Sequence, residues 1–224
     1  MRREIECLLR WLRDLFFPPK CVLCRGLLAR DQTHFCPECR KRAPVYGKSN
    51  FTISFVARWT GVWYYKDVVR RSLIRYKFSG QRHYVHAYAQ VLALRLRQEQ
   101  MENFDVLTFV PIAPLRRWIR GYDQVEILAE ALGKEMGIPA VRTLKKIRNN
   151  IPQSRLRDVH RRRANVLGAY RVNDAARICG KRVLLLDDVV TTGATASECA
   201  RTLLSSGTKE VILATMAVAY HDRK

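Results

Sequence analysis

The stretch that decides the fold runs from residue 181 to residue 195 and reads Lys-Arg-Val-Leu-Leu-Leu-Asp-Asp-Val-Val-Thr-Thr-Gly-Ala-Thr. An apolar strand ends in two carboxylates, Asp187 and Asp188, and a short Thr/Gly loop then leads into a helix. Ligands of open α/β sheets bind beyond the carboxyl ends of the strands, so this loop lies where a ligand is expected. The backbone N–H groups of residues 192–195 would face outward at the N-terminus of that helix and form a cradle for an anion.

The side chains of this loop suit a ribose that carries a phosphate. Threonine hydroxyls can donate hydrogen bonds to phosphate oxygens, and glycine permits close approach of the backbone. The two aspartates would repel a phosphate, but they can accept hydrogen bonds from two vicinal hydroxyls and help hold Mg²⁺ through water. The predicted phosphoribosyl-binding residues are Asp187, Asp188, Thr191, Thr192, Gly193, Ala194 and Thr195.

A strand–turn–helix in which threonine only caps the helix is the simpler alternative, and the paired aspartates between strand and loop argue against it. The stretch also lacks the Gly-Lys-Ser/Thr of a Walker P-loop. It resembles the phosphoribosyl diphosphate-binding motif of type I phosphoribosyltransferases. The resemblance implies an α/β fold with a parallel sheet flanked by helices, and it implies phosphoribosyl diphosphate with Mg²⁺ as the ligand.

The first position of the loop separates ligand binding from catalysis. Purine members of that wider fold place an aspartate there, where it can act on the base ring as a general acid or base. This chain has Thr191 at that position, so nothing in the loop offers this proton transfer. The resemblance therefore implies binding of a phosphoribosyl ligand better than it implies a particular transfer reaction, and it assigns no catalytic residue.

Four of the seven cysteines form two Cys-x-x-Cys pairs separated by eleven residues. Each pair can place two thiolates on one metal from a tight turn, and two such turns complete a tetrahedral site. Disulfides are the alternative, but a Cys-x-x-Cys pair is short for a structural bridge. The spacing predicts a closed, structural zinc site formed by Cys21, Cys24, Cys36 and Cys39. The other three, Cys7, Cys179 and Cys199, have apolar neighbours and are predicted to be buried.

Strand-like and helix-like stretches alternate along the chain, which is typical of βαβ units and a parallel sheet. Apolar runs predict strands at residues 51–58, 63–65, 106–110, 183–186 and 210–218. Helical spacing predicts helices at residues 2–17, 68–76, 85–100, 122–136 and 194–205. The expected domains are an amphipathic N-terminal helix (1–19), a zinc-ribbon-like knuckle (20–44) and a phosphoribosyltransferase-like domain (45–224).

The charge balance favours a polyanionic partner. The 224 residues include 41 Lys+Arg and 20 Asp+Glu, a net charge of +21, and clustered positive charge raises the local concentration of phosphates. A solvated basic face is the alternative. Residues 142–163 hold nine basic residues and one acidic residue, and residues 149–163 lack an apolar period, which predicts a loop. With neither a signal peptide nor the ~18 apolar residues of a membrane span, we expect a cytoplasmic protein that is not integral to a membrane.

The order of motifs resembles that of the ComF family of competence and DNA-utilisation proteins over nearly the full length. The family's usual Arg-Gly-Phe-Asn-Gln is Arg-Gly-Tyr-Asp-Gln here, and Ala113 stands where a second proline is common, so Asp123 is given no role. The matching motifs, in order, are the four-cysteine knuckle, Arg75-Tyr76-Lys77-Phe78, Val110-Pro111-Ile112, Arg120-Gly121-Tyr122-Asp123-Gln124, Gln153, Leu156, Arg161 to Arg163, Asn165 and the aspartate loop.

Two functions from different classes follow. In the first, a ComF-like protein of DNA uptake in natural competence binds single-stranded DNA: basic residues grip phosphates, Tyr and Trp side chains stack on bases, and proteins of the uptake machinery are further partners. In the second, a salvage-type phosphoribosyltransferase uses phosphoribosyl diphosphate and Mg²⁺. A charge of +21 exceeds what one small anion requires and favours the first. The residues predicted to contact pyrophosphate or DNA phosphate are Lys77, Arg116, Arg117, Arg120, Arg161, Arg162 and Arg163.

Overall fold

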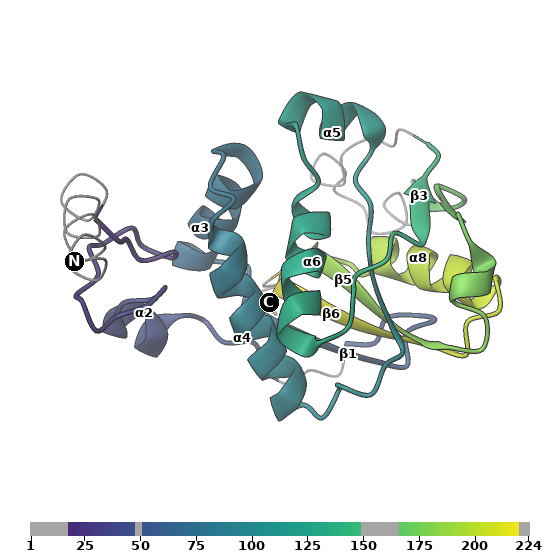
Figure 1. Ribbon diagram of the computed structural model, residues 1–224, viewed down its shortest axis with the longest axis horizontal. Coiled ribbons are helices and arrows are strands. Elements are labelled where there is room, and N and C mark those ends of the chain that lie inside the picture. The colour runs from purple at the N-terminus through teal and green to yellow at the C-terminus, as the bar shows by residue number, and fades with distance from the viewer. Residues whose placement is uncertain (1–17, 48–50, 149–165, 220–224) are drawn as a thin grey trace, which may run out of the picture.

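A parallel four-stranded sheet forms the centre of the molecule (Figure 1). The computed structural model describes residues 18–47, 51–148 and 166–219. The strands lie side by side in the order β1-β6-β5-β2, and all three pairings are parallel, which confirms the predicted sheet. Their bounds are β1 (Arg58–Tyr64), β2 (Val106–Phe109), β5 (Arg182–Val190) and β6 (Glu210–Val218).

Helices and a small second sheet complete the described part of the fold. Two short strands, β3 (Leu144–Lys146) and β4 (Tyr170–Val172), pair antiparallel beside the main sheet. The helices are α2 (Pro37–Arg42), α3 (Asp67–Phe78), α4 (Tyr84–Gln98), α5 (Pro114–Arg120), α6 (Gln124–Met136) and α8 (Ala194–Leu204), with a 3₁₀ turn, η2, at Ala175–Arg177.

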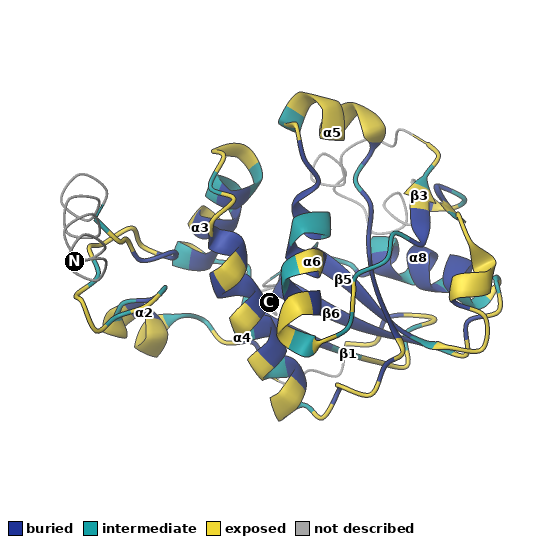
Figure 2. Cartoon of the chain, viewed as in Figure 1, coloured by how far each residue is buried: buried dark blue, intermediate teal, exposed yellow. Residues whose placement is uncertain are grey.

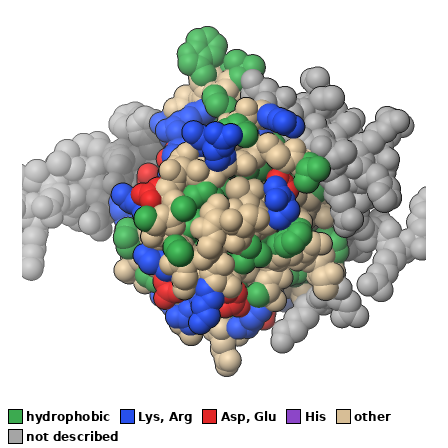
Figure 3. All heavy atoms as spheres, turned by 90° about the vertical axis from the view of Figure 1, so that its right-hand side faces the viewer, with side chains coloured by type: hydrophobic (Ala, Val, Ile, Leu, Met, Phe, Trp, Pro, Cys, Tyr) green, Lys and Arg blue, Asp and Glu red, His purple; other side chains and the backbone are tan. Residues whose placement is uncertain are grey.

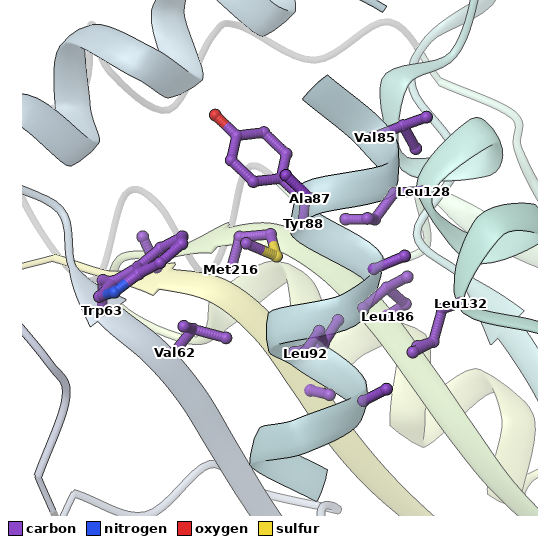
Figure 4. Packing of buried hydrophobic residues seen from close by; sticks show 14 of the residues in the cluster. Val62, Trp63, Val85, Ala87, Tyr88, Leu92, Leu128, Leu132, Leu186 and Met216 are labelled. Carbon is purple, nitrogen blue, oxygen red and sulfur yellow. The ribbon is translucent and has the colours of Figure 1, made fainter. Parts of the chain in front are cut away.

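The main sheet is covered on both faces because its central strands are apolar on both faces. Leu184 and Leu186 of β5 belong to a core that includes the buried faces of α4 and α6. Val183 and Leu185, which alternate with them, belong to a second core on the opposite face with α8. Figure 4 shows the first core, with Leu186 close to side chains of α4 and α6. Near-continuous apolar runs are typical of parallel strands buried in this way.

The four-cysteine knuckle lies at one end of the molecule, beyond α3 (Figure 1). The Ser72 hydroxyl of α3 donates a hydrogen bond to the carbonyl oxygen of Val22 at 2.5 Å. The Arg75 guanidinium donates to the carbonyl oxygens of Val22, at 3.1 Å, and Leu23, at 2.7 Å. The side chains of Val22 and Leu23 are buried in the core that contains α3. Packing and hydrogen bonds therefore join the knuckle to the larger domain.

The strand predicted at residues 51–58 is wrong, and the strand predicted at 63–65 covers only the end of a single longer strand, β1. The apolar run before it cannot stay extended because Phe55 has a φ of 66°. Gly61 lies in the middle of β1, where a Cβ atom would come 2.6 Å from Cγ2 of Val218 on β6. This glycine is required for close strand packing and does not interrupt the strand.

The structure also differs from the sequence predictions in the length of one strand and in the burial of one cysteine. The strand predicted at 183–186 continues to Val190, because Asp187, Val189 and Val190 still pair with residues of β6. The predicted burial of Cys199 is confirmed, but Cys179 is exposed, since it lies in the turn between η2 and β5. The predicted helix at 2–17, the loop at 149–163 and Cys7 lie outside the described residues. None of the described helices has the length and apolar composition needed to cross a bilayer.

Candidate functional site

The candidate site lies at the carboxyl ends of β2 and β5, where the connections of two neighbouring strands diverge. From β2 the chain runs through α5 and α6 to Ala140, which bridges to Leu107 on the outer side of β2. From β5 it runs through the Thr/Gly loop and α8 to β6, on the opposite side. Such a reversal of direction opens a crevice beyond the strand ends, and ligands of open α/β sheets bind there.

The Thr/Gly loop makes a tight turn between β5 and α8. Gly193 is the N-cap residue of α8 and has a φ of 71°. A Cβ atom at this position would lie 2.9 Å from Cγ1 of Ile53, so both the backbone conformation and the available space favour glycine. The Thr192 hydroxyl oxygen is shielded from water and makes no hydrogen bond with any described residue. An oxygen of a bound phosphate is the kind of partner that this hydroxyl lacks.

The two aspartates at the end of β5 are both buried. Burial, together with the neighbouring Asp188 carboxylate, raises the pKa of Asp187 to about 8. An Asp187 carboxylate oxygen accepts a hydrogen bond from the backbone N–H of Asp188 at 2.8 Å. Two carboxylates kept close together out of water favour a cation or several hydroxyl donors between them, which are the groups that a Mg²⁺-bound ribose offers.

A chain of polar contacts connects Asp188 to three helices. Lys77, in the last turn of α3, forms an ion pair with Asp188, with 3.0 Å between Nζ and Oδ1. Gln124, the first residue of α6, donates from Nε2 to Oδ2 of Asp188 at 2.7 Å. The Oε1 atom of Gln124 accepts a hydrogen bond from Arg120 at the end of α5. The structure thus brings Lys77 to Asp188 directly and Arg120 to it through Gln124, while their predicted contact with phosphate stays a prediction.

Gln124 and Asp123 are the functional-site residues to which sequence reasoning gave no role. Asp123 caps α6: its Oδ1 accepts hydrogen bonds from the N–H groups of Val125 and Glu126, and its Oδ2 accepts one from Ile112 at 3.0 Å. This carboxylate ties the segment after β2 to the start of α6 and thereby positions Gln124. The Asp-Gln pair after Arg120-Gly121-Tyr122 is the pattern that could have indicated it.

The remaining predicted phosphate-contacting residues are placed differently. Arg117 pairs with Glu126 at 3.2 Å and so faces α6. Arg116 is exposed on α5 and makes no ion pair with any described residue. Arg161, Arg162 and Arg163 lie outside the described residues. Their assignment therefore stays a prediction.

The four cysteines of the knuckle form a second, separate site. Their sulfur atoms all lie within 4.8 Å of one another, and the Sγ atoms of Cys24 and Cys36 are 3.7 Å apart. Four Zn–S bonds of about 2.3 Å in a tetrahedron require sulfurs about 3.8 Å apart, so the donor set fits zinc. Backbone N–H groups of Gly26 and Cys36 also point at ligand sulfurs, at 3.3 and 3.4 Å. Four thiolates leave no open coordination position, so this zinc is structural.

Comparison with known proteins supports both the phosphoribosyltransferase-like fold and the zinc-binding knuckle. A phosphoribosyl transferase domain model matches residues 121–224, and a double zinc ribbon domain model matches residues 12–50. Competence protein ComFC of Bacillus subtilis is 28% identical over 196 residues, which cover 84% of this chain and 78% of that protein. Competence protein F of Haemophilus influenzae is 26% identical over 219 residues, covering 88% of this chain and 95% of that protein. The chain belongs to the ComF family.

This ComF-family chain is also similar to other proteins, at a similar or lower sequence identity or over a smaller share of the chain. DNA utilization protein YhgH of Salmonella typhimurium is 26% identical over 196 residues, covering 85% of the chain and 80% of that protein. A solved structure described as the allosteric regulatory enzyme of purine biosynthesis superposes with a TM-score of 0.41 and 21% identity, covering 63% of the chain. The ComF-family chain spans 29% of the length of that enzyme.

Proposed function

We propose that this ComF-family chain acts in DNA uptake or utilisation, and that it binds single-stranded DNA together with a phosphorylated ribose and Mg²⁺. The observation that supports the ribose most strongly is the buried Asp187–Asp188 pair beside the Thr/Gly turn at the topological switch point. The relatives named for competence and for DNA utilisation support the biological role.

The residues present suit a Mg²⁺-bound phosphoribosyl diphosphate. The two aspartates would accept hydrogen bonds from the ribose hydroxyls and help hold the metal through water, while the residues of the Thr/Gly loop would bind the 5-phosphate. Lys77 beside Asp188 and Arg120 beside Gln124 supply the positive charge that a diphosphate would need. Lys77 forms an ion pair with Asp188, and binding of the ligand would exchange this ion pair for contacts with Mg²⁺ and phosphate.

The proposal that single-stranded DNA is the second ligand rests on the net positive charge of the chain. A chain of net charge +21 has far more positive groups than one small anion can use, and phosphate contacts supply most of the affinity for a DNA strand. Segment 142–163, with its nine basic residues, is the region we propose to grip the backbone. If four to six phosphates are neutralised, log Kd should change with log salt with a slope of roughly 3 to 4, since each contact on a single strand contributes about 0.7.

The experiment is a titration of fluorescent oligo-dT with the zinc-loaded chain at several salt concentrations. Replacing Arg161, Arg162 and Arg163 by Ala should weaken binding and make the salt dependence shallower, whatever the DNA sequence. A wild-type chain that binds no single-stranded DNA at moderate salt would contradict the proposed DNA function. An unchanged affinity in the triple variant would remove this segment from the interface.

A salvage-type phosphoribosyltransferase is the alternative function, and the site itself is what favours it. The aspartate pair, the Thr/Gly turn and the nearby Lys77 and Arg120 would suit a transferase equally well. Against purine chemistry, Thr191 stands where an acid or base would be needed. Release of pyrophosphate from phosphoribosyl diphosphate in the presence of a nucleobase, and its loss on replacing Asp187 and Asp188 by Ala, would establish this function.

A further inference from the structure

Helix α3 lies between the zinc knuckle and the candidate ligand site and contacts both (Figure 1). Arg75 and Lys77 are two residues apart, so their side chains leave the helix about 160° away from each other. Arg75 donates hydrogen bonds to the knuckle, whereas Lys77 forms the ion pair with Asp188. A single turn of α3 therefore contacts the knuckle on one side and the ligand site on the other.

On the knuckle side, α3 is bonded to the turn that carries the first two zinc ligands, residues 21–24. The Ser72 hydroxyl and the Arg75 guanidinium donate to the carbonyl oxygens of Val22 and Leu23, which lie between those two cysteines. Figure 2 shows a buried stretch of the knuckle beside α3, whereas α2 is mostly exposed. A metal that fixes this turn thereby also fixes the two carbonyl groups that hold α3.

On the site side, Tyr76 joins α3 to the start of α6. Its hydroxyl donates a hydrogen bond to the backbone carbonyl oxygen of Gln124 at 2.7 Å. Its own carbonyl oxygen accepts a hydrogen bond from the Tyr122 hydroxyl at 2.5 Å. Lys77 is the next residue of α3, and both Lys77 and Gln124 contact Asp188. The position of α3 thus determines where two of the groups around Asp188 lie.

Buried hydroxyl groups connect the two sides of α3. The hydroxyl oxygens of Ser72 and Tyr88, a residue of α4, are 2.7 Å apart, and Tyr88 is the donor because the Ser72 hydrogen goes to Val22. The Tyr88 ring meets the Tyr76 ring edge-on, with 5.2 Å between the centroids. Ser72, Tyr76 and Tyr88 are fully buried. A shift of α3 would leave such groups without partners, which costs free energy, so α3 favours one position.

We propose that zinc in the knuckle strengthens binding of the Mg²⁺-bound phosphoribosyl ligand, with Ser72, Arg75 and Tyr76 as the positioning residues that couple the two sites. This inference rests on the proposed phosphoribosyl site and adds a regulation of that site. The zinc-fixed turn favours the position of α3 in which the Lys77 ammonium group reaches Asp188, and loss of zinc would release this cation. By thermodynamic linkage, the ligand must strengthen zinc binding by the same factor.

The experiment measures the zinc affinity of the full chain by competition with a chromogenic chelator, with and without saturating Mg²⁺–phosphoribosyl diphosphate. The ligand should raise the zinc affinity by roughly 5- to 150-fold, the usual range for coupled sites. The chain with both Asp187 and Asp188 replaced by Ala should keep its zinc, bind no ligand and show no such increase. An equal increase in that variant would come from the solution chemistry of the ligand and would overturn the inference.

The coupling is distinct from a general attraction of anions to the chain. Lys and Arg side chains are spread over the end of the molecule that faces away from the knuckle (Figure 3), and a net charge of +21 attracts any polyanion. High salt screens such exposed charges but affects buried contacts less. The effect of the ligand on zinc affinity should therefore persist at high salt while calorimetry shows the site saturated, and its disappearance there would contradict the proposal.

Three single substitutions test whether α3 is the connection. Arg75→Met removes the guanidinium hydrogen bonds to the knuckle, and Tyr76→Phe removes only the hydroxyl that donates to Gln124. Each should weaken ligand binding about 5-fold or more and reduce the effect of the ligand on zinc affinity, although neither side chain is a proposed ligand contact. Arg95→Met is the matched control, because Arg95 donates to the carbonyl oxygen of Tyr46 at 3.0 Å, where the chain leaves the knuckle for β1. It should change neither quantity.

Each other outcome identifies which idea has failed. If calorimetry detects no binding of the ligand to wild type, the proposed phosphoribosyl site fails and this inference fails with it. If wild type binds the ligand but its zinc affinity stays unchanged or falls, the site stands and the coupling is refuted. If Arg95→Met reduces the coupling as much as Arg75→Met does, the knuckle acts through the general stability of the chain, and α3 is not the connection.

Discussion

Replacing Lys77 by Met tests whether the aspartate pair is held in place by its cation. Met keeps most of the length and the apolar stem of the side chain but removes the ammonium group, which lies 3.0 Å from Asp188. Without it, the Asp188 carboxylate remains in a buried environment beside the Asp187 carboxyl group, where the described donors are Gln124 and the backbone N–H group of Asp188. The chain should therefore lose stability as well as ligand affinity.

The expected loss of stability depends on how far the ion pair is buried. Removing one partner of a fully buried ion pair costs about 3–5 kcal/mol. The side chains of Lys77 and Asp188 are 16% and 11% exposed, so we expect about 2–3 kcal/mol once some solvation of the remaining carboxylate is allowed for. The pair of Arg177 and Asp174 has the same 3.0 Å separation but is 62% and 47% exposed. Arg177→Met should therefore cost less than about 1 kcal/mol, and it serves as the matched control.

The assay is urea unfolding of the zinc-loaded chain at pH 7, followed by circular dichroism. A double-mutant cycle of Lys77→Met with Asp188→Asn separates the pair from other effects, and we expect a coupling of about 1–3 kcal/mol. In the double variant, Asn in place of Asp188 removes the unpaired charge and should recover part of the stability that Lys77→Met loses. If Lys77→Met costs no more than Arg177→Met, or if the coupling is zero, the ion pair does not stabilise the site and the reasoning from burial is refuted.

Four further predictions concern the zinc site, the ligand site and the packing. Cys36→Ser should lose the zinc, measured as metal per chain, and destabilise the knuckle; full zinc retention would contradict the assignment. Replacing both Asp187 and Asp188 by Ala should abolish calorimetric binding of Mg²⁺–phosphoribosyl diphosphate with an unchanged circular dichroism spectrum, whereas unchanged binding would favour the capping-turn alternative. Gly133→Ala should destabilise the chain by about 1–2 kcal/mol in urea: its Cβ would lie 2.5 Å from a backbone carbonyl oxygen, and overpacking of about 1–3 kcal/mol exceeds the gain of about 1 kcal/mol in helix propensity. A Gly133→Ala variant more stable than wild type would show that the backbone at Ile138 can move aside at little cost in free energy. Burial raises the pKa of Glu198, but hydrogen bonds from an arginine and a backbone N–H outweigh it and leave the pKa below its ordinary value. This stabilisation is present above the unfolded-state pKa and is lost as the pH falls through the folded-state pKa, so the stability difference between wild type and Glu198→Gln should shrink in acid.

Local pattern was sufficient for the long, regular elements and for the zinc site. The strand at Glu210–Val218 coincides with its prediction, and the helices α4, α6 and α8 lie within one or two residues of theirs. Each is long enough for its apolar period to be unambiguous. The four cysteines were equally clear, because the spacing within each pair already decides that two thiolates can share a metal.

Short elements could not be predicted in this way. The strands β3 and β4 have three residues each, and α5 has no buried face, so neither kind has a period to detect. The first strand was misplaced because Phe55 turns the chain at a positive φ and Gly61 continues the strand. Both positions depend on what packs against them from β6 and the loop, which the local sequence does not contain.

The sequence by itself determined the chemistry on which the proposed ligand rests: two aspartates, a Thr/Gly turn and a following helix suit a ribose phosphate. Only the tertiary structure decided which groups complete that site. Lys77 and Gln124 come from different helices and contact Asp188, and Arg120 from a third helix donates to Gln124. Gln124 can reach Asp188 because the parallel strands β2 and β5 bring their carboxyl ends to one edge of the sheet. The tertiary structure likewise decided that Trp118 is exposed, since burial depends on whether another element covers a helix, and none of the described elements covers α5.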